Sequence, residues 1–145
     1  MILLDTDHFT ALKYEDGATA HRLRSRMVES ADEDFAITAI TVEEQLRGWL
    51  TQIAGKIDPV RQVSAYRRLT DLIRFFNSWQ IVEFDDAAAE RLVNLRKAKI
   101  RIGTMDLKIA ATALVNDALL LTANAKDFNC VPGLRTENWL EAPKK

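Results

Sequence analysis

Ile2-Leu3-Leu4-Asp5-Thr6-Asp7 is a short apolar run that ends on two carboxylates. A second apolar run, residues 118–121, leads in the same way into Thr122-Ala123-Asn124-Ala125-Lys126-Asp127. Apolar runs of this length between polar segments are typical of buried strands in a parallel sheet. Ligands bind beyond the carboxyl ends of such strands, so both polar segments are expected at the edge of the sheet where a site forms.

Two further acidic motifs open predicted helices. They are Thr41-Val42-Glu43-Glu44 and Gly103-Thr104-Met105-Asp106. In an α/β chain, helices begin at the edge where strands end, so these carboxylates are expected near Asp5. Carboxylates gathered at one edge repel each other unless a cation lies among them. The four motifs together therefore indicate a functional site.

The rest of the chain alternates between predicted strands and helices. Strands are expected at residues 1–5, 35–40, 79–84, 118–122 and 136–140, and helices at about 7–14, 18–30, 41–53, 58–77, 87–98 and 105–116. This alternation favours an α/β fold with a parallel sheet covered on both faces. The prediction is one three-layer α/β/α domain over residues 1–145, with an αα-hairpin at about 41–77.

The ends and faces of the helices can also be predicted. Asp7 is expected to cap the first helix, and Thr41 to cap the third in a capping box with Glu44. The fourth helix is expected to start with the cap Asp58. Its predicted buried stripe is Val63, Tyr66, Leu69, Ile73 and Phe76.

The composition is that of an ordinary globular domain. The chain has 145 residues and 48% hydrophobic content, enough for one well-packed core, and no window long and apolar enough to span a membrane. It lacks a signal-peptide pattern and has one cysteine, Cys130, so a reducing cytoplasm is expected. A net charge of −1 argues against a protein that holds nucleic acid by charge alone.

Asp5, Glu44 and Asp106 are the candidate metal ligands. Asp5 needs a role because Asp7 is better placed to cap the helix, and Asp106 opens an otherwise apolar helix, where an acid should have a partner. A structural role stays open for Glu44 and for Asp106. Glu44 fits a capping box, and Asp106 is favoured in a first turn by the helix dipole.

The fourth ligand position is open between Asn124, a neutral oxygen donor, and Asp127, which reaches the edge if its segment is a tight turn. These are hard oxygen donors, without His or Cys at metal-binding spacing, so Mg²⁺ or Mn²⁺ is expected rather than Zn²⁺. Such a site supports hydrolysis of phosphodiesters by metal-activated water.

Four segments resemble the PIN-domain family, and more narrowly the VapC-type toxins of bacterial toxin–antitoxin pairs. They are residues 2–8, 38–48, 103–111 and 121–128, in family order and spread over nearly the whole chain. The resemblance implies a Mg²⁺- or Mn²⁺-dependent endoribonuclease with a five-stranded parallel sheet of order 3-2-1-4-5. By position, Asp5, Glu44 and Asp106 correspond to the core metal-site acids.

The resemblance also implies roles for neighbouring residues. Asn124 stands where the family often has a fourth acid, with Asp127 as the substitute catalytic carboxylate. The number of metal ions at the site, one or two, therefore stays open. Thr6 and Thr104 stand where the family places hydroxyls near the site. RNA contact would fall to four basic residues that precede the Asp106 motif: Arg96, Lys97, Lys99 and Arg101.

Partners follow from the same resemblance. It implies an RNA substrate, a VapB-type antitoxin, and a homodimer or a toxin–antitoxin hetero-oligomer. The antitoxin would lie on the αα-hairpin, where the candidate groove residues are Trp49, Leu50, Ile53 and Phe75.

Other functions fit parts of the pattern. Another metal-dependent nuclease would use the same acids, but the chain is short for the elements that hold DNA. A phosphatase would use Asp5 as a nucleophile, with Asp7 two residues later. A catalytically weak or inactive PIN-like domain that binds a partner is supported by Asn124.

Overall fold

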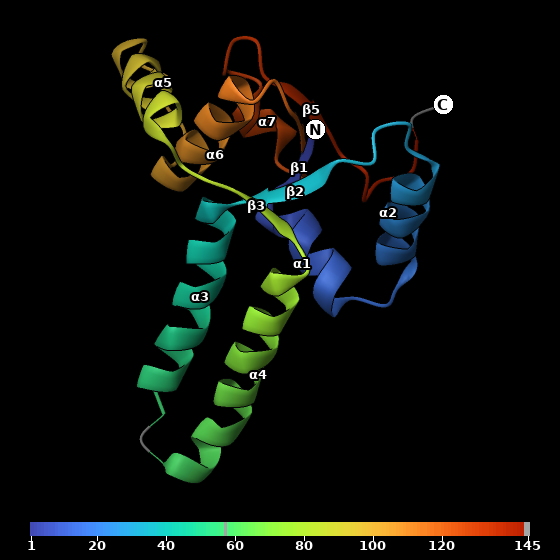
Figure 1. The fold of residues 1–145 in the computed structure, drawn as a ribbon, viewed down its shortest axis with the longest axis vertical. Helices are drawn as coiled ribbons and strands as arrows, with labels where there is room; N and C mark the ends of the chain where they lie inside the picture. The colour runs from blue at the N-terminus through green and yellow to red at the C-terminus, as the bar shows by residue number, and fades with distance from the viewer. Residues whose placement is uncertain (57, 144–145) are drawn as a thin grey trace.

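The computed structural model describes residues 1–56 and 58–143. Its centre is a parallel sheet of five strands in the order β3-β2-β1-β4-β5 (Figure 1). The strands are β1 (Ile2–Leu4), β2 (Phe35–Thr38), β3 (Gln80–Val82), β4 (Leu119–Leu121) and β5 (Arg135–Glu137). The predicted fold class and strand order are confirmed, although β5 ends at residue 137 rather than 140.

Helices connect the strands and cover both faces of the sheet. They are α1 (Thr6–Tyr14), α2 (Ala18–Glu29), α3 (Ala39–Ala54), α4 (Pro59–Asn77), α5 (Asp86–Lys97), α6 (Thr104–Val115) and α7 (Ala125–Phe128). No helix in the described part of the chain is both long and apolar enough to cross a bilayer.

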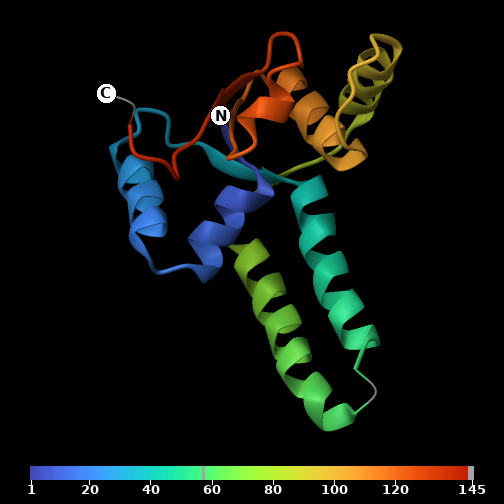
Figure 2. The same cartoon turned by 180° about the vertical axis from the view of Figure 1, so that it is seen from behind.

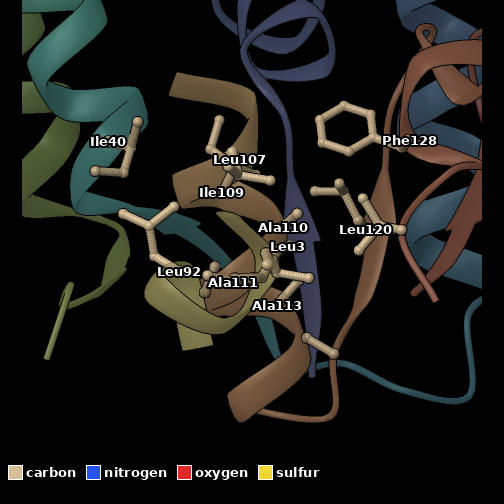
Figure 3. Close-up of a cluster of buried hydrophobic side chains, with 14 residues drawn as sticks. Leu3, Ile40, Leu92, Leu107, Ile109, Ala110, Ala111, Ala113, Leu120 and Phe128 are labelled. Atoms are coloured by element: carbon tan, nitrogen blue, oxygen red, sulfur yellow. The ribbon is translucent and has the colours of Figure 1, made fainter. Parts of the chain in front are cut away.

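Side chains of β1 alternate between two hydrophobic clusters, as the pleat of a strand requires. Leu3 points into one cluster, where it packs with α6 residues such as Ala110 and with Leu120 of β4 (Figure 3). Ile2 and Leu4 point into the other cluster, which includes residues of α1, α2 and α4. Because both faces are covered, the central strands β1 and β4 are apolar without interruption, which explains their sequence pattern.

Helices α3 and α4 pack against each other as a hairpin that extends away from the sheet (Figures 1 and 2). Of the predicted buried stripe of α4, Phe76 is buried and Leu69 is half-buried. Ala65 and Leu72 are buried with Phe76, whereas Tyr66 and Ile73 are 51% and 45% exposed. A helix that projects from the sheet buries only a narrow stripe of side chains. In α4 this stripe is the one that faces α3 and α1.

The predicted capping box of α3 is wrong. The helix begins at Ala39, because Thr38 takes the cap position and its Oγ1 accepts the N–H of Thr41 at 3.2 Å. Thr41 therefore lies inside the first turn, where its buried hydroxyl has no partner within the described residues. Glu44 therefore does not cap α3, and its side chain is hydrogen-bonded by α1 instead. The cap of α1 is likewise Asp5, not Asp7, with Asp5 accepting from the Thr6 amide.

Two substitutions distinguish the observed cap from the predicted one. Thr38→Ala should destabilise the fold by about 1 kcal/mol because it leaves a helix N–H without its acceptor. Thr41→Val should be neutral or stabilising by up to about 1 kcal/mol, since it removes a buried hydroxyl without a partner. Urea unfolding of both variants checks this, and a capping box at Thr41 would reverse the order.

Candidate functional site

Three of the predicted acids lie where separate elements begin at the carboxyl edge of the sheet. Asp5 joins β1 to α1 and is only 6% exposed. Glu44 lies near the beginning of α3, and Asp106 lies in the first turn of α6. The charge of Asp106 is near enough to raise the pKa of both Asp5 and Glu44. The fold therefore brings the three into one electrostatic environment.

Asp5 is held by two hydrogen bonds. Its Oδ1 accepts the N–H of Thr6 at 2.8 Å, and its Oδ2 accepts the hydroxyl of Thr122 at 2.8 Å. Burial, followed by the charge of Asp7, nevertheless raises the pKa of Asp5 from an ordinary 3.8 to about 7. The two hydrogen bonds act in the opposite direction. A buried carboxylate with this pKa is only weakly compensated by the protein around it.

Glu44 is oriented by α1. The hydroxyl of Thr6 donates to Glu44 Oε2 at 2.8 Å, which joins the first residue of α1 to α3. Burial, and then the charge of Asp106, raises the pKa of Glu44. Thr6 thus links the two acids. It contacts the first acid through its backbone and the second through its side chain.

Asp106 completes the set. Its pKa is raised by burial and then by the charges of Asp127 and Asp7. Asp127 lies in α7, a one-turn helix where a tight turn was expected, and Asn124 Nδ2 donates to Asp127 Oδ2 at 2.9 Å. Asp127 therefore faces the same edge as the other acids, while Asn124 holds it there.

Two residues of the network were missed by sequence reasoning. Asp7 was predicted to be a helix cap, but its Oδ2 accepts the N–H of Ala123 at 2.8 Å, and its charge acts on Asp5 and Asp106. Thr122 has no predicted role beyond its place where a strand leads into a polar segment. Its position gave a usable signal, because a hydroxyl that follows a buried apolar run needs a hydrogen-bond partner.

The basic residues lie around the helix pair α5 and α6. Arg96 and Lys97 are exposed in the last turn of α5, and Lys99 and Arg101 are exposed in the connection to α6. The helices run side by side, and residues 98–103 cross back from the end of α5 to the beginning of α6 (Figures 1 and 2). Arg101 lies three residues before Thr104, the first residue of the helix that carries Asp106, whereas Arg96 and Lys97 belong to α5.

The donor atoms suit a hard divalent cation, since they are carboxylate oxygens with hydroxyl and amide oxygens beside them. Within residues 1–56 and 58–143, however, no three His, Cys, Asp or Glu side chains are close enough together to enclose an ion. Hydrogen bonds hold Glu44, Asp5 and Asp127 in place, while like charges act on Asp106. The arrangement fits the chemistry of Mg²⁺ or Mn²⁺ but is not closed around one.

The PIN-domain family model matches residues 2–134. The chain belongs to the PIN-domain family. This PIN domain is 51% identical over 45 residues to ribonuclease VapC1 of Rickettsia felis, a match that covers 30% of this chain and 34% of that protein. It is 31% identical over 77 residues to the tRNA(fMet)-specific endonuclease VapC of Shigella flexneri, over 50% of this chain and 58% of that one.

These matches span about a third to somewhat more than half of the relatives' own lengths. Similarity of fold covers more of the chain than similarity of sequence does. A toxin–antitoxin complex from Klebsiella pneumoniae contains a chain similar to this PIN domain with a TM-score of 0.67 and 22% identity, covering 96% of this chain and 98% of that chain. At this identity the likeness shows a common fold.

Proposed function

We propose that this PIN domain is the toxin of a VapBC-type toxin–antitoxin pair, an endoribonuclease that hydrolyses RNA phosphodiesters with Mg²⁺ or Mn²⁺. The observation that carries the proposal is the group of three partly or fully buried carboxylates, Asp5, Glu44 and Asp106, each with a raised pKa. Such an uncompensated group is stabilised by a divalent cation. The relatives named ribonuclease VapC1 and tRNA-specific endonuclease VapC support RNA as the substrate.

Asp5, Glu44 and Asp106 would hold the cation, with Asp127 available from α7. The bound ion supplies Lewis acidity toward water and phosphate oxygens. The protein contributes orientation, because the hydroxyls of Thr122 and Thr6 fix Asp5 and Glu44. Thr104, exposed at the first residue of α6, is available to hydrogen-bond a phosphate oxygen of the RNA.

The antitoxin would bind along α3. A shallow hollow of about 430 Å³ lies there, lined by Ala39, Val42, Glu43, Leu46, Arg47 and Leu50. Of the four predicted groove residues, Leu50 is 55% exposed and Trp49 is half-buried. Ile53 is buried, and Phe75 packs its ring edge-on to Phe9 at 5.5 Å. The likeness to a chain of a toxin–antitoxin complex supports this partner.

The test is cleavage of total RNA and purified tRNA by the isolated protein with Mg²⁺ or Mn²⁺. Discrete fragments are expected, and they should vanish in EDTA and with Asp5→Ala. Asp16→Ala is the matched control, because Asp16 is exposed between α1 and α2. Intact RNA from folded wild-type protein, together with no Mn²⁺ binding by calorimetry, would favour the alternative of an inactive partner-binding domain.

Charge on the α5–α6 connection is expected to contribute to RNA affinity. Arg101→Gln should weaken RNA binding more than Lys97→Gln does, since Arg101 lies just before the helix that carries Asp106, whereas Lys97 ends α5. Each lost phosphate contact should reduce the slope of log affinity against log salt by about 0.7 for single-stranded RNA. Filter binding in EDTA at several salt concentrations measures both quantities. Equal effects of the two variants would place the RNA elsewhere.

A further inference from the structure

His8 lies in the first turns of α1 and is fully buried, with both ring nitrogens hydrogen-bonded. The backbone N–H of Trp139 donates to its Nε2 at 3.1 Å. Its Nδ1 lies 2.6 Å from Asp7 Oδ1. Because Nε2 accepts a hydrogen bond, it carries no proton, and the proton of the neutral ring is on Nδ1. His8 therefore donates to Asp7 in one fixed tautomer.

Asp7 is consequently held from two sides. His8 binds Oδ1, while Oδ2 accepts the N–H of Ala123 at 2.8 Å and lies 3.5 Å from the hydroxyl of Thr122. The same hydroxyl donates to Asp5. The carboxylate of Asp7 thus stands beside that of Asp5 in an orientation fixed by the folded chain.

Trp139 connects this arrangement to α2. Its ring is buried and lies under the guanidinium of Arg26 at 4.9 Å, and the carbonyl of the next residue, Leu140, accepts from Arg22. Trp139 follows residue 134, where the match to the family model ends. The contact with His8 therefore comes from the part of the chain that follows this match.

We propose that His8, fixed by the amide of Trp139, is a positioning residue that aims the negative charge of Asp7 at the carboxylate site and so increases its affinity for the divalent cation. The inference rests on the proposed function. It is carried by the chain of hydrogen bonds Trp139 to His8 to Asp7, and by the shared Thr122 hydroxyl. Groups that orient metal-site residues in this way typically contribute 10–100-fold in affinity.

Two substitutions of His8 distinguish its hydrogen bond to Asp7 from its hydrogen bond to Trp139. Asparagine places an amide nitrogen near Nδ1, so His8→Asn keeps a donor for Asp7 and loses the acceptor for Trp139. Glutamine places its carboxamide near Nε2, so His8→Gln keeps the acceptor and loses the donor. His21→Gln is the matched control, since His21 is exposed on α2. Asp7→Asn removes the charge itself.

The measurements are Mn²⁺ affinity by calorimetry without RNA, and the Ala123 amide resonance of the metal-free protein by NMR. His8→Gln and Asp7→Asn are expected to bind Mn²⁺ about tenfold more weakly, with a moved Ala123 resonance. His8→Asn should stay within about threefold of wild type, because an amide nitrogen donates to Asp7 without a tautomer that Trp139 must fix. Equal losses in the two His8 variants, or wild-type affinity in Asp7→Asn, would overturn the proposal.

The two proposals fail in different ways. If the wild-type protein binds no Mn²⁺, the metal-dependent function fails, and the Ala123 resonance still decides whether His8 orients Asp7. If neither His8 variant folds, Asp7→Asn decides, because its side chain is 32% exposed and the substitution keeps its shape.

Discussion

Replacing Asp106 with asparagine is expected to abolish RNA cleavage while raising the thermal stability of the protein in EDTA. The substitution keeps the shape of the side chain but removes a carboxylate whose pKa is raised by burial and by the charges of Asp127 and Asp7. Because the residue is partly exposed, solvent screens this repulsion, and the gain should be about 1 kcal/mol. For a domain of this size that corresponds to a rise in Tm of about 2–4 °C.

The RNA-cleavage activity of Asp106→Asn should fall, and by a much larger factor than the change in stability. Loss of a group that stabilises charge in the transition state typically costs about a hundredfold to a thousandfold, and a lost metal ligand should reach the upper end. Asp16→Asn provides the control for stability and activity. If Asp106→Asn lowered the Tm as well as abolishing cleavage, Asp106 would have a structural role in α6 and not a role in metal binding.

The metal-free protein is expected to lose stability as the pH rises from about 4 to 7. The folded state holds a proton on Asp5 up to a pKa of about 7, whereas the unfolded chain releases it near 3.8. Between these values the folded state binds more protons, so stability falls with increasing pH and levels off above about 7. The shift corresponds to about 4 kcal/mol over the whole window.

Urea unfolding in EDTA at pH 5 and pH 8 measures this dependence. Wild type should lose about 3 kcal/mol between the two, and Asp5→Asn should lose much less, since it has no proton to release. Mg²⁺ should restore more stability at pH 8 than at pH 5, because it binds the ionised form. The same pH slope in wild type and Asp5→Asn would show that Asp5 is not the titrating group.

The sequence predicted the centre of the sheet well because β1 and β4 are covered on both faces and are therefore continuously apolar. Ile2-Leu3-Leu4 and Leu119-Leu120-Leu121 required no tertiary information to be recognised. The same runs located Asp5 and the segment after β4 at one edge. Acids at the beginnings of α3 and α6 followed from the alternation of strands and helices.

Choices between similar local alternatives were not predictable in this way. Thr38 and Thr41 are both competent helix caps, and the position of β2 in the sheet selects Thr38. Helix α4 carries two apolar lines, and only its packing on α3 and α1 buries Leu72 rather than Ile73. Hydrogen bonds between distant residues, such as Thr122 to Asp5, leave no periodic pattern in the sequence.

The contact between Trp139 and His8 has a consequence for how the protein is made. The two residues are separated by 131 positions, and Thr122 and Asp5 by 117. Because a chain is synthesised from its N-terminus, Asp5 and His8 exist long before the groups that hold them. The acidic edge therefore takes its final form only after β4 and the segment beyond β5 have joined the sheet. A nascent chain that stops before Thr122 carries the acids without the arrangement that makes them a site.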